Sequence, residues 1–412
     1  MSTASRPTRV AEILDPYERG MLALQDGLRR ILASYDPDLY EALLAEAVLT
    51  MHAGEGEELT GRQEDLVNRF RFRAPPDNPH EASVRNRVLL TMSHVAKHLA
   101  WRDAFSVLDP DPDAWDDFGL LKPSSLVDTA SFVDTPYRAD PIIVLPRPLE
   151  IVTEGAVRGP SPNRLVRVHY LGVQLGAYIE REGWGSHGVS TTVPRDQWSG
   201  VSLTFFGPIY DMDGSPHQTV FGGQDVRHTT VFVRADRAAV PLSEVTARAV
   251  AEMRHNAAFA GMRPVHTADG LEELISSTIG LLIYMHCRNA ELRKEPPLIR
   301  RKARRGSPKV TQRAVNTTSS LWTVGPAIGA SIRASRAELG VAEDASARAG
   351  IGGELTGKGG RKLPGRYYTG PHDHRYAAPN QPGGYVSHWR PGIWCAADRP
   401  PARTITPVVR ER

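Results

Sequence analysis

The spacing of apolar residues changes twice along the chain, and this change constrains the fold more than any other feature. Over residues 10–51 and 81–105 apolar residues recur at intervals of three and four, which predicts amphipathic helices. From 141 to about 236 the apolar runs are short and rich in β-branched and aromatic residues, which predicts strands. The helical spacing returns over 243–260 and 271–292. We therefore expect an α+β fold, with a helical N-terminal region, a central mixed or antiparallel sheet with covering helices, and a small basic C-terminal α+β module.

Charge divides the chain in a second way. Residues 1–140 carry 15 Lys and Arg against 24 Asp and Glu, whereas residues 291–412 carry 22 against 9. This asymmetry indicates an anionic partner for the basic end, or a contact between the two ends. The Asp- and Pro-rich run after residue 105 predicts an irregular connector. We therefore divide the chain into an acidic helical region (1–105), an Asp/Pro-rich connector (106–140), a central sheet plus two helices (141–292), a basic linker (293–320) and a C-terminal basic aromatic module (321–412).

Composition argues against several classes of protein. The chain has no run of 18 apolar residues for a bilayer-spanning helix, and its N-terminus lacks the apolar core of a signal peptide. We therefore expect a cytoplasmic protein. The two cysteines, Cys287 and Cys395, are too few for a cysteine-based zinc site. Residues 352–359 nearly match a phosphate-binding loop, but Gly359 stands where that loop needs a serine or threonine. We expect neither a metal nor a cofactor.

The basic linker begins with a dense run of positive charge. Eight of the seventeen residues from 293 to 309 are Lys or Arg, and one is acidic. Proline, glycine and mutual repulsion disfavour a packed element here. Such an arm either contacts the phosphates of RNA or DNA or is a solvated tether. The residues predicted to contact phosphate are Arg300, Arg301, Lys302, Arg304 and Arg305.

Recognition residues are densest near the C-terminus, where His388, Trp389, Arg390 and Trp394 fall within seven positions. Aromatic faces stack on bases while neighbouring cations meet phosphates, so this pattern is typical of nucleic-acid binding. The same residues can form a protein-binding hot spot. In a third interpretation the tryptophans are the core of a small module. The other residues predicted to bind a partner are Trp322, Arg333 and Arg375.

Three histidines of this region are candidate catalytic residues. His372 and His374 flank Asp373, and His388 follows downstream. Two histidines can act as general base and acid on a ribose 2′-hydroxyl while an arginine stabilises phosphate charge, which would give a metal-independent ribonuclease. The same side chains can ligate a metal. Geometry decides between these roles, and sequence spacing does not supply it.

Three segments occur in an order that resembles a family of phage and plasmid proteins, one of which is a type V-A anti-CRISPR protein. The segments are Tyr284–Leu292, Trp322–Arg333 and His388–Trp394. The resemblance implies a regulatory protein of a mobile element. For the anti-CRISPR member it implies recognition of the N-terminal portion of a CRISPR nuclease during translation, with loss of the nuclease message. This chain departs from the family at Ile393, where a second histidine is usual.

We therefore predict a regulatory binding protein of a mobile element that engages a nascent polypeptide, the ribosome or RNA. It would use the basic arm and the aromatic and arginine residues near the C-terminus. One alternative is a metal-independent ribonuclease that uses His372, His374 and His388. Another is a nucleic-acid-binding protein for plasmid maintenance. The sequence leaves open whether the chain is an enzyme, which polypeptide it engages and in what oligomeric state it acts.

Overall fold

The computed structural model describes about three fifths of the chain. The structure describes residues 6–34, 37–53, 106–134, 141–154, 165–181, 184–188, 193–218, 224–236, 238–259, 268–294, 320–338, 367–369, 371–377 and 385–395, and the single positions 88, 92, 95, 96 and 98. Within these residues no helix is both long enough and apolar enough to span a membrane.

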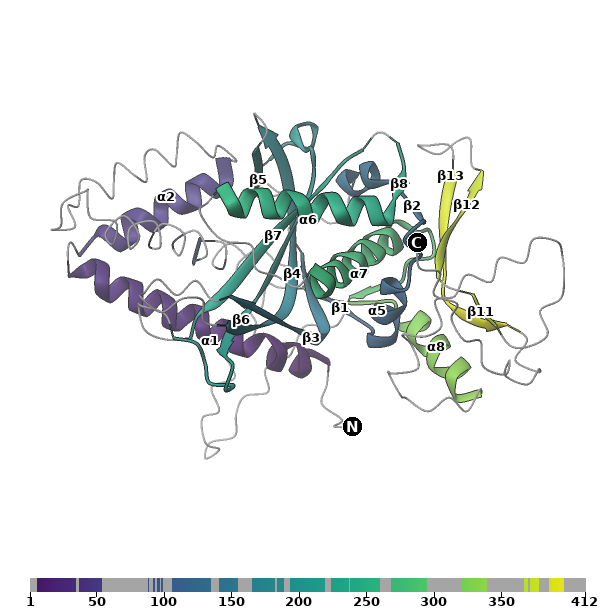
Figure 1. Cartoon of the computed structure of the whole chain (residues 1–412), viewed down its shortest axis with the longest axis horizontal. Helices are drawn as coiled ribbons and strands as arrows, with labels where there is room; N and C mark the ends of the chain where they lie inside the picture. The colour runs from purple at the N-terminus through teal and green to yellow at the C-terminus, as the bar shows by residue number, and fades with distance from the viewer. Residues whose placement is uncertain are drawn as a thin grey trace.

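An eight-stranded mixed sheet forms the centre of the molecule (Figure 1). Its order is β7-β6-β4-β3-β1-β10-β9, and β5 pairs with β4. Strands β3, β4, β5, β6 and β7 pair antiparallel, whereas β1 runs parallel to both β3 and β10. The strands are β1 (Ser106–Pro110), β3 (Ile142–Glu154), β4 (Leu165–Arg181), β5 (Trp184–Gly188), β6 (Gly200–Asp211), β7 (Val226–Arg234), β9 (Leu292–Lys294) and β10 (Ser320–Val324). The predicted α+β fold with a mixed central sheet is confirmed.

Helices cover both faces of this sheet because its central strands are apolar on both sides. Val107 and Val144 pack in one core with α1 (Arg6–Ala33) and α2 (Leu39–Ala53). Their sequence neighbours Leu108 and Ile143 point the other way, into a core with α5 (Pro112–Gly119), α6 (Leu242–Phe259) and α7 (Ala268–His286). Short elements complete this body: β2 (Leu126–Val127), η1 (Thr129–Asp134), η2 (Arg195–Gln197) and β8 (Val240–Pro241).

The segment after residue 105 is not the irregular connector that its Asp and Pro content predicts. Ser106–Pro110 is β1, a buried strand in the middle of the sheet, and a helix follows at once. The Asp-Pro pairs serve that helix: Asp111 caps α5 by accepting a hydrogen bond from the backbone N–H of Asp113, and Pro112 occupies the first helical position. Residues that usually interrupt regular structure therefore mark the start of a helix here.

The strands at the two ends of the predicted basic linker pair with each other in the central sheet. β9 includes the first two residues of the linker, β10 begins at its last residue, and the two strands are antiparallel neighbours. Helix α8 (Pro326–Glu338) follows β10. The remaining strands form two ribbons beside α5 and α8, at the end of the molecule away from α2 (Figure 1). These strands are β11 (Tyr367–Thr369), β12 (His372–Ala377), β13 (Tyr385–Arg390) and β14 (Ile393–Cys395).

Candidate functional site

Strands β12 and β13 form an antiparallel ribbon that brings the three candidate histidines together. In its register His372 lies opposite Arg390, and His374 lies opposite His388. Successive residues of a strand alternate between faces, so positions 372, 374, 388 and 390 share one face of the ribbon. The side chains of His372 and His388 are half-buried, and that of Arg390 is exposed. We call these four positions the histidine–arginine face.

Trp389 lies on the opposite face of the ribbon and belongs to the protein core. Its side chain is 2% exposed. The indole packs edge-on against Phe118 and Tyr284, with ring centroids 5.3 and 5.9 Å away. Its Nε1 donates a hydrogen bond to Oδ2 of the buried Asp117 at 3.3 Å. A ring held in this way is inaccessible to a base or a peptide, so the core interpretation accounts for Trp389.

Hydrogen bonds from the segment after α7 fix the backbone of the ribbon. The amide of Asn289 donates from Nδ2 to the carbonyl of Trp389 at 2.9 Å, and its Oδ1 accepts from the N–H of Trp389 at 2.8 Å. The backbone N–H of Arg288 donates to the carbonyl of Ser387 at 2.8 Å. The edge of β13 that faces away from β12 is therefore paired with residues 288 and 289.

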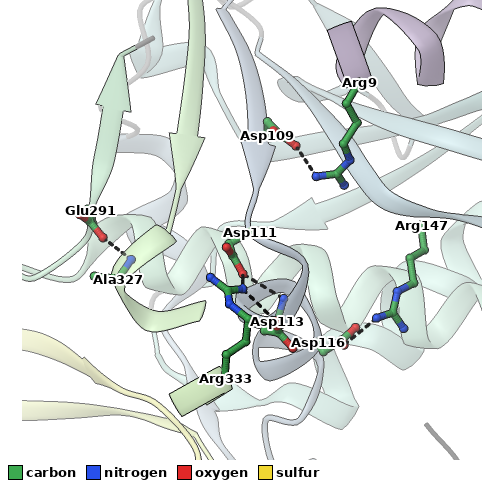
Figure 2. A network of polar contacts seen from close by, with 9 residues as sticks. All are labelled: Arg9, Asp109, Asp111, Asp113, Asp116, Arg147, Glu291, Ala327 and Arg333. Atoms are coloured by element: carbon green, nitrogen blue, oxygen red, sulfur yellow. Dashed lines mark hydrogen bonds and ion pairs between the residues drawn. The ribbon is translucent and has the colours of Figure 1, made fainter. Parts of the chain in front are cut away.

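Helix α8 is fixed to the same body by three acidic residues (Figure 2). Glu291 accepts hydrogen bonds from the N–H of Gly325 on its carbonyl and from the N–H of Ala327 on Oε2, at 3.0 and 2.7 Å. Arg333 donates from Nη1 to Asp111 at 2.9 Å and to Asp113 at 2.8 Å. The hydrogen bond to Asp111 is the main reason that the pKa of Arg333 is raised above its ordinary value.

The remaining predicted binding residues are placed as follows. Trp322 is partly buried in β10, with Lys294 Nζ 5.7 Å from its ring centroid. Arg375 donates from Nε to Asp373 Oδ2 at 3.1 Å. The predicted arm residues Arg300, Arg301, Lys302, Arg304 and Arg305 lie outside the described residues, as do the side chains of His374 and Trp394. Arg333 and Arg375 are thus engaged in ion pairs within the protein.

A second candidate site is an open groove of about 450 Å³ between α1 and the sheet. The pairing of β3 with β4 shifts register between Val144 and Leu149, a stretch that contains Pro146 and Pro148. Proline lacks an N–H for the ladder, so two prolines so close together break the pairing. The pairing of β4 with β6 also shifts, beside Pro208. The groove lies along this irregular line in the sheet, and we call it the proline-lined groove.

Ring surfaces dominate the walls of the groove. Its lining includes Pro16, Pro146, Pro148, Pro208, His169 and Tyr210. The rings of His169 and Tyr210 lie 4.5 Å apart, and His169 Nε2 lies 2.9 Å from Glu150 Oε2. On the α1 side Arg9 donates from Nη2 to the carbonyl of Pro146 at 3.1 Å, which ties the helix to β3. Glu12 is exposed and adds a negative charge to the lining.

Comparisons with known proteins give likenesses to solved structures. No protein-family model matches the chain, and no curated protein matches it. Among solved structures, the crystal structure of AcrVA2, an anti-CRISPR protein, aligns with 90% of this chain and 97% of its own. The TM-score is 0.37 and the sequence identity is 11%. The chain therefore resembles an anti-CRISPR protein weakly in structure, and its function is inferred below from its own residues.

Two further features are the metal-ligating side chains among the described residues and the environment of the Cys287 thiol. No group of three or more His, Cys, Asp or Glu side chains among them is placed to hold a metal ion. Cys287 is buried, and burial together with the nearby Asp373 raises the pKa of its thiol to about 12. A thiol with this pKa is protonated at neutral pH and is a poor nucleophile.

We therefore expect Cys287 to resist alkylation in the folded protein. In a Cys395→Ser variant, which leaves Cys287 as the sole thiol, iodoacetamide at pH 8 should modify the native chain at least about tenfold more slowly than the urea-unfolded chain. Mass spectrometry measures both rates. Equal rates would mean that the thiol is accessible and ionised more readily than its burial implies.

The groove is the feature that sequence reasoning missed. Its walls come from α1, β3, β4 and β6, which are far apart in the sequence. The available signal was the pair Pro146 and Pro148 inside an apolar run, because proline within a strand pattern indicates a bulge or an edge. That signal predicts a break in the sheet, but it does not predict that α1 lies over it.

Proposed function

We propose that the chain is a regulatory binding protein that recognises an extended polypeptide segment in the proline-lined groove. The observation that carries this proposal is the open groove of about 450 Å³, walled by pyrrolidine and aromatic rings at the irregular line of the sheet. A volume of this size accommodates several side chains of a bound segment. The walls are rigid, because they are rings on a backbone held by the sheet and by α1.

A polypeptide fits this groove better than a small polar metabolite does. Flat rings such as Tyr210 and Pro148 offer apolar contact area and few hydrogen-bond donors, which suits apolar side chains of an extended chain. The exposed carboxylate of Glu12 suits a basic group at one point along that chain. The preferred ligand is therefore an extended segment with apolar side chains and a positive charge.

The sequence resemblance described above indicates which polypeptide to test first. Residues 284–292, 322–333 and 388–394 resemble those of proteins among which one recognises a CRISPR nuclease during translation. We therefore take the N-terminal segment of a nascent type V-A CRISPR nuclease as the candidate ligand. Loss of the nuclease message would follow from this recognition in translating cells.

Ribosome–nascent-chain complexes that display this nuclease segment provide a direct binding assay. Immobilised wild-type protein should capture them, and puromycin, which releases the nascent chain, should free the ribosome and leave the polypeptide bound. Tyr210→Ala should weaken capture about tenfold or more, since truncating an aromatic anchor in an interface removes about 1–2 kcal/mol of binding or more. Ribosomal RNA and the nuclease segment are quantified separately.

Arg147→Ala is the matched control for this assay. Arg147 lies between Pro146 and Pro148 in sequence, but its side chain is absent from the groove lining and lies 3.9 Å from Asp116. We expect this variant to capture the complexes as well as the wild type does. Equal capture by Tyr210→Ala and wild type would contradict the groove as the site. Ribosome capture that survives puromycin would contradict nascent-chain recognition.

The ribonuclease alternative is favoured by one observation, the register that sets His374 opposite His388 with Arg390 on the same face. This arrangement puts two imidazole-bearing positions within reach of one phosphodiester. A binding protein, in contrast, leaves RNA intact. We expect a fluorescently labelled RNA to stay full length after prolonged incubation with the protein in chelator. Cleavage that disappears in His388→Ala would instead establish the enzyme.

A further inference from the structure

We propose that the polypeptide bound in the proline-lined groove continues across the neighbouring face of the sheet and places a second apolar side chain against Leu165 and Met212. This inference rests on the proposed function, and it adds a second contact surface and a spacing requirement for the ligand. Among the described residues four large apolar side chains are exposed, and two of them are Leu165, at 46%, and Met212, at 42%. We call these two residues the apolar shelf.

Strand pairing sets the apolar shelf next to the groove. Val166 of β4 lies opposite Asp211 of β6. Their sequence neighbours Leu165 and Met212 are therefore adjacent at the end of the two paired strands. Tyr210, which lines the groove, is two residues from Met212. Two residues of extended chain span about 7 Å, so one short segment can contact both the groove and the shelf.

The shelf continues the face of the sheet that α5, α6 and α7 do not cover. Alternate residues of the three strands are buried in the core with those helices, namely Ile151, Val166, Val168 and Ile209. The residues between them lie on the other face and are half-buried or exposed, namely Leu165, Arg167, His169 and Tyr210. An extended ligand that leaves the groove along β6 therefore meets the side chains of this second face.

The polar side chains of this face contact one another. Glu150 lies 3.6 Å from Nη1 of Arg167 and 2.9 Å from Nε2 of His169. A charged ligand side chain would have to compete with these contacts, whereas an apolar one gains contact area with Leu165 and Met212 without disturbing them. The shelf therefore favours an apolar side chain of the ligand.

The turn that carries Met212 is ordered by its own hydrogen bonds. The N–H of Asp211 donates to the carbonyl of Ser215 at 2.8 Å, and the N–H of Gly214 donates to the carbonyl of Asp211 at 2.9 Å. Gly214 has a φ of +86°, which glycine adopts without strain. His217 Nδ1 lies 2.9 Å from Asp211 Oδ1 and closes the turn. A surface that is already ordered loses little conformational entropy on binding, and a methionine side chain adapts to partners of different shape.

An extended segment suits the shelf better than a second copy of this chain does. A stable interface between two proteins buries about 800 Å² on each partner, and two half-exposed apolar side chains supply only a small part of that area. A segment already anchored in the groove needs only one further side-chain contact. Alternate side chains of an extended segment face the sheet, so we expect apolar ligand residues at positions i and i+2, one over Tyr210 and the other over the shelf.

Capture of ribosomes that display the N-terminal segment of a type V-A CRISPR nuclease tests the shelf. The double variant Leu165→Ser/Met212→Ser should weaken capture about fivefold, because two apolar contacts are lost. The control Leu120→Ser/Leu126→Ser removes two exposed leucines next to α5 and in β2, and it should capture like the wild type. Serine scanning of the displayed segment should find two sensitive apolar positions that are two residues apart.

Failure of the shelf and failure of the groove give different results. If Tyr210→Ala weakens capture but the shelf variant, with unchanged thermal unfolding, captures like the wild type, the shelf proposal is overturned and the groove stands. Equal weakening by the Leu120→Ser/Leu126→Ser control, or a single sensitive position in the displayed segment, overturns the shelf as well. No capture by the wild type, or capture that neither Tyr210→Ala nor the shelf variant weakens, overturns the groove and the shelf together.

Discussion

Trp389→Ala should lower the free energy of unfolding by about 4 kcal/mol, within the roughly 3–5 kcal/mol typical of a fully buried tryptophan replaced by alanine. The indole fills space against Phe118 and Tyr284, so its loss leaves a cavity where the ribbon meets α5 and α7. It also removes the Nε1 donor from the buried carboxylate of Asp117. Urea unfolding followed by circular dichroism measures the effect.

Two variants test whether this loss comes from packing at Trp389. Trp389→Phe keeps most of the ring but not the Nε1 donor, so it should cost about 1–2 kcal/mol. Arg390→Ala changes the next residue, which is exposed, and should be within about 0.5 kcal/mol of the wild type. If Trp389→Ala unfolds at the same urea concentration as Arg390→Ala, the ribbon is not anchored as described.

Gly329→Ala is the second substitution with a large expected effect. A Cβ at position 329 would lie 1.9 Å from Oδ1 and 2.3 Å from Cγ of Asp111. Asp111 caps α5 and accepts from Arg333, so it cannot move away without losing both interactions. We expect a loss of about 2 kcal/mol, typical of overpacking at a closed contact. Thermal and urea unfolding measure it.

A double-mutant cycle tests whether the contact with Asp111 causes the loss of stability in Gly329→Ala. Asp111→Ala should itself destabilise the protein, because it removes the helix cap and the partner of Arg333. In that background Gly329→Ala should cost little, since the carboxylate that it would strike is gone. The expected coupling is therefore about 2 kcal/mol. A cost of Gly329→Ala that is unchanged in the Asp111→Ala background would show that the close approach of α8 to Asp111 is not what the glycine permits.

The fold class follows from sequence because the change in apolar spacing is strong and local. The prediction of an irregular connector was wrong at β1 and α5, and the reason is also physical. Asp109–Pro110–Asp111–Pro112 contains the residues that most often interrupt regular structure. In this chain they end a strand and cap a helix, and the distinction depends on the parallel pairing of β1 with β3 and β10. A local sequence pattern does not predict pairing between segments that are distant in the chain.

The three segments of the sequence resemblance turn out to meet in space. Tyr284 and Asn289 contact Trp389, and Glu291 caps the helix that carries Gly329 and Arg333. Sequence reasoning read several of these residues as a binding surface, since tryptophan and arginine also dominate such surfaces. Side-chain type cannot distinguish a residue that holds two elements together from one that holds a ligand. The histidine positions differ, because the register places them on the face of the ribbon opposite Trp389.

The sequence alone does not predict the proline-lined groove, because the groove forms only where two structural features coincide. One is the loss of register at Pro146 and Pro148, and the other is the position of α1 above it, held by Arg9 on the carbonyl of Pro146. Figure 2 shows Arg9 reaching from α1 to Asp109 of β1 as well, at 3.9 Å. The groove thus depends on contacts between segments more than a hundred residues apart.

Site-specific photo-crosslinking tests polypeptide recognition in the groove most directly. A chain with p-benzoylphenylalanine in place of Tyr210 is irradiated with ribosomes that display the N-terminal segment of a type V-A CRISPR nuclease. We predict a crosslink to the nascent polypeptide from position 210 and none from the same group at Arg147. A crosslink from position 147 alone, or none from 210 while ribosomes are still captured, would contradict recognition in this groove.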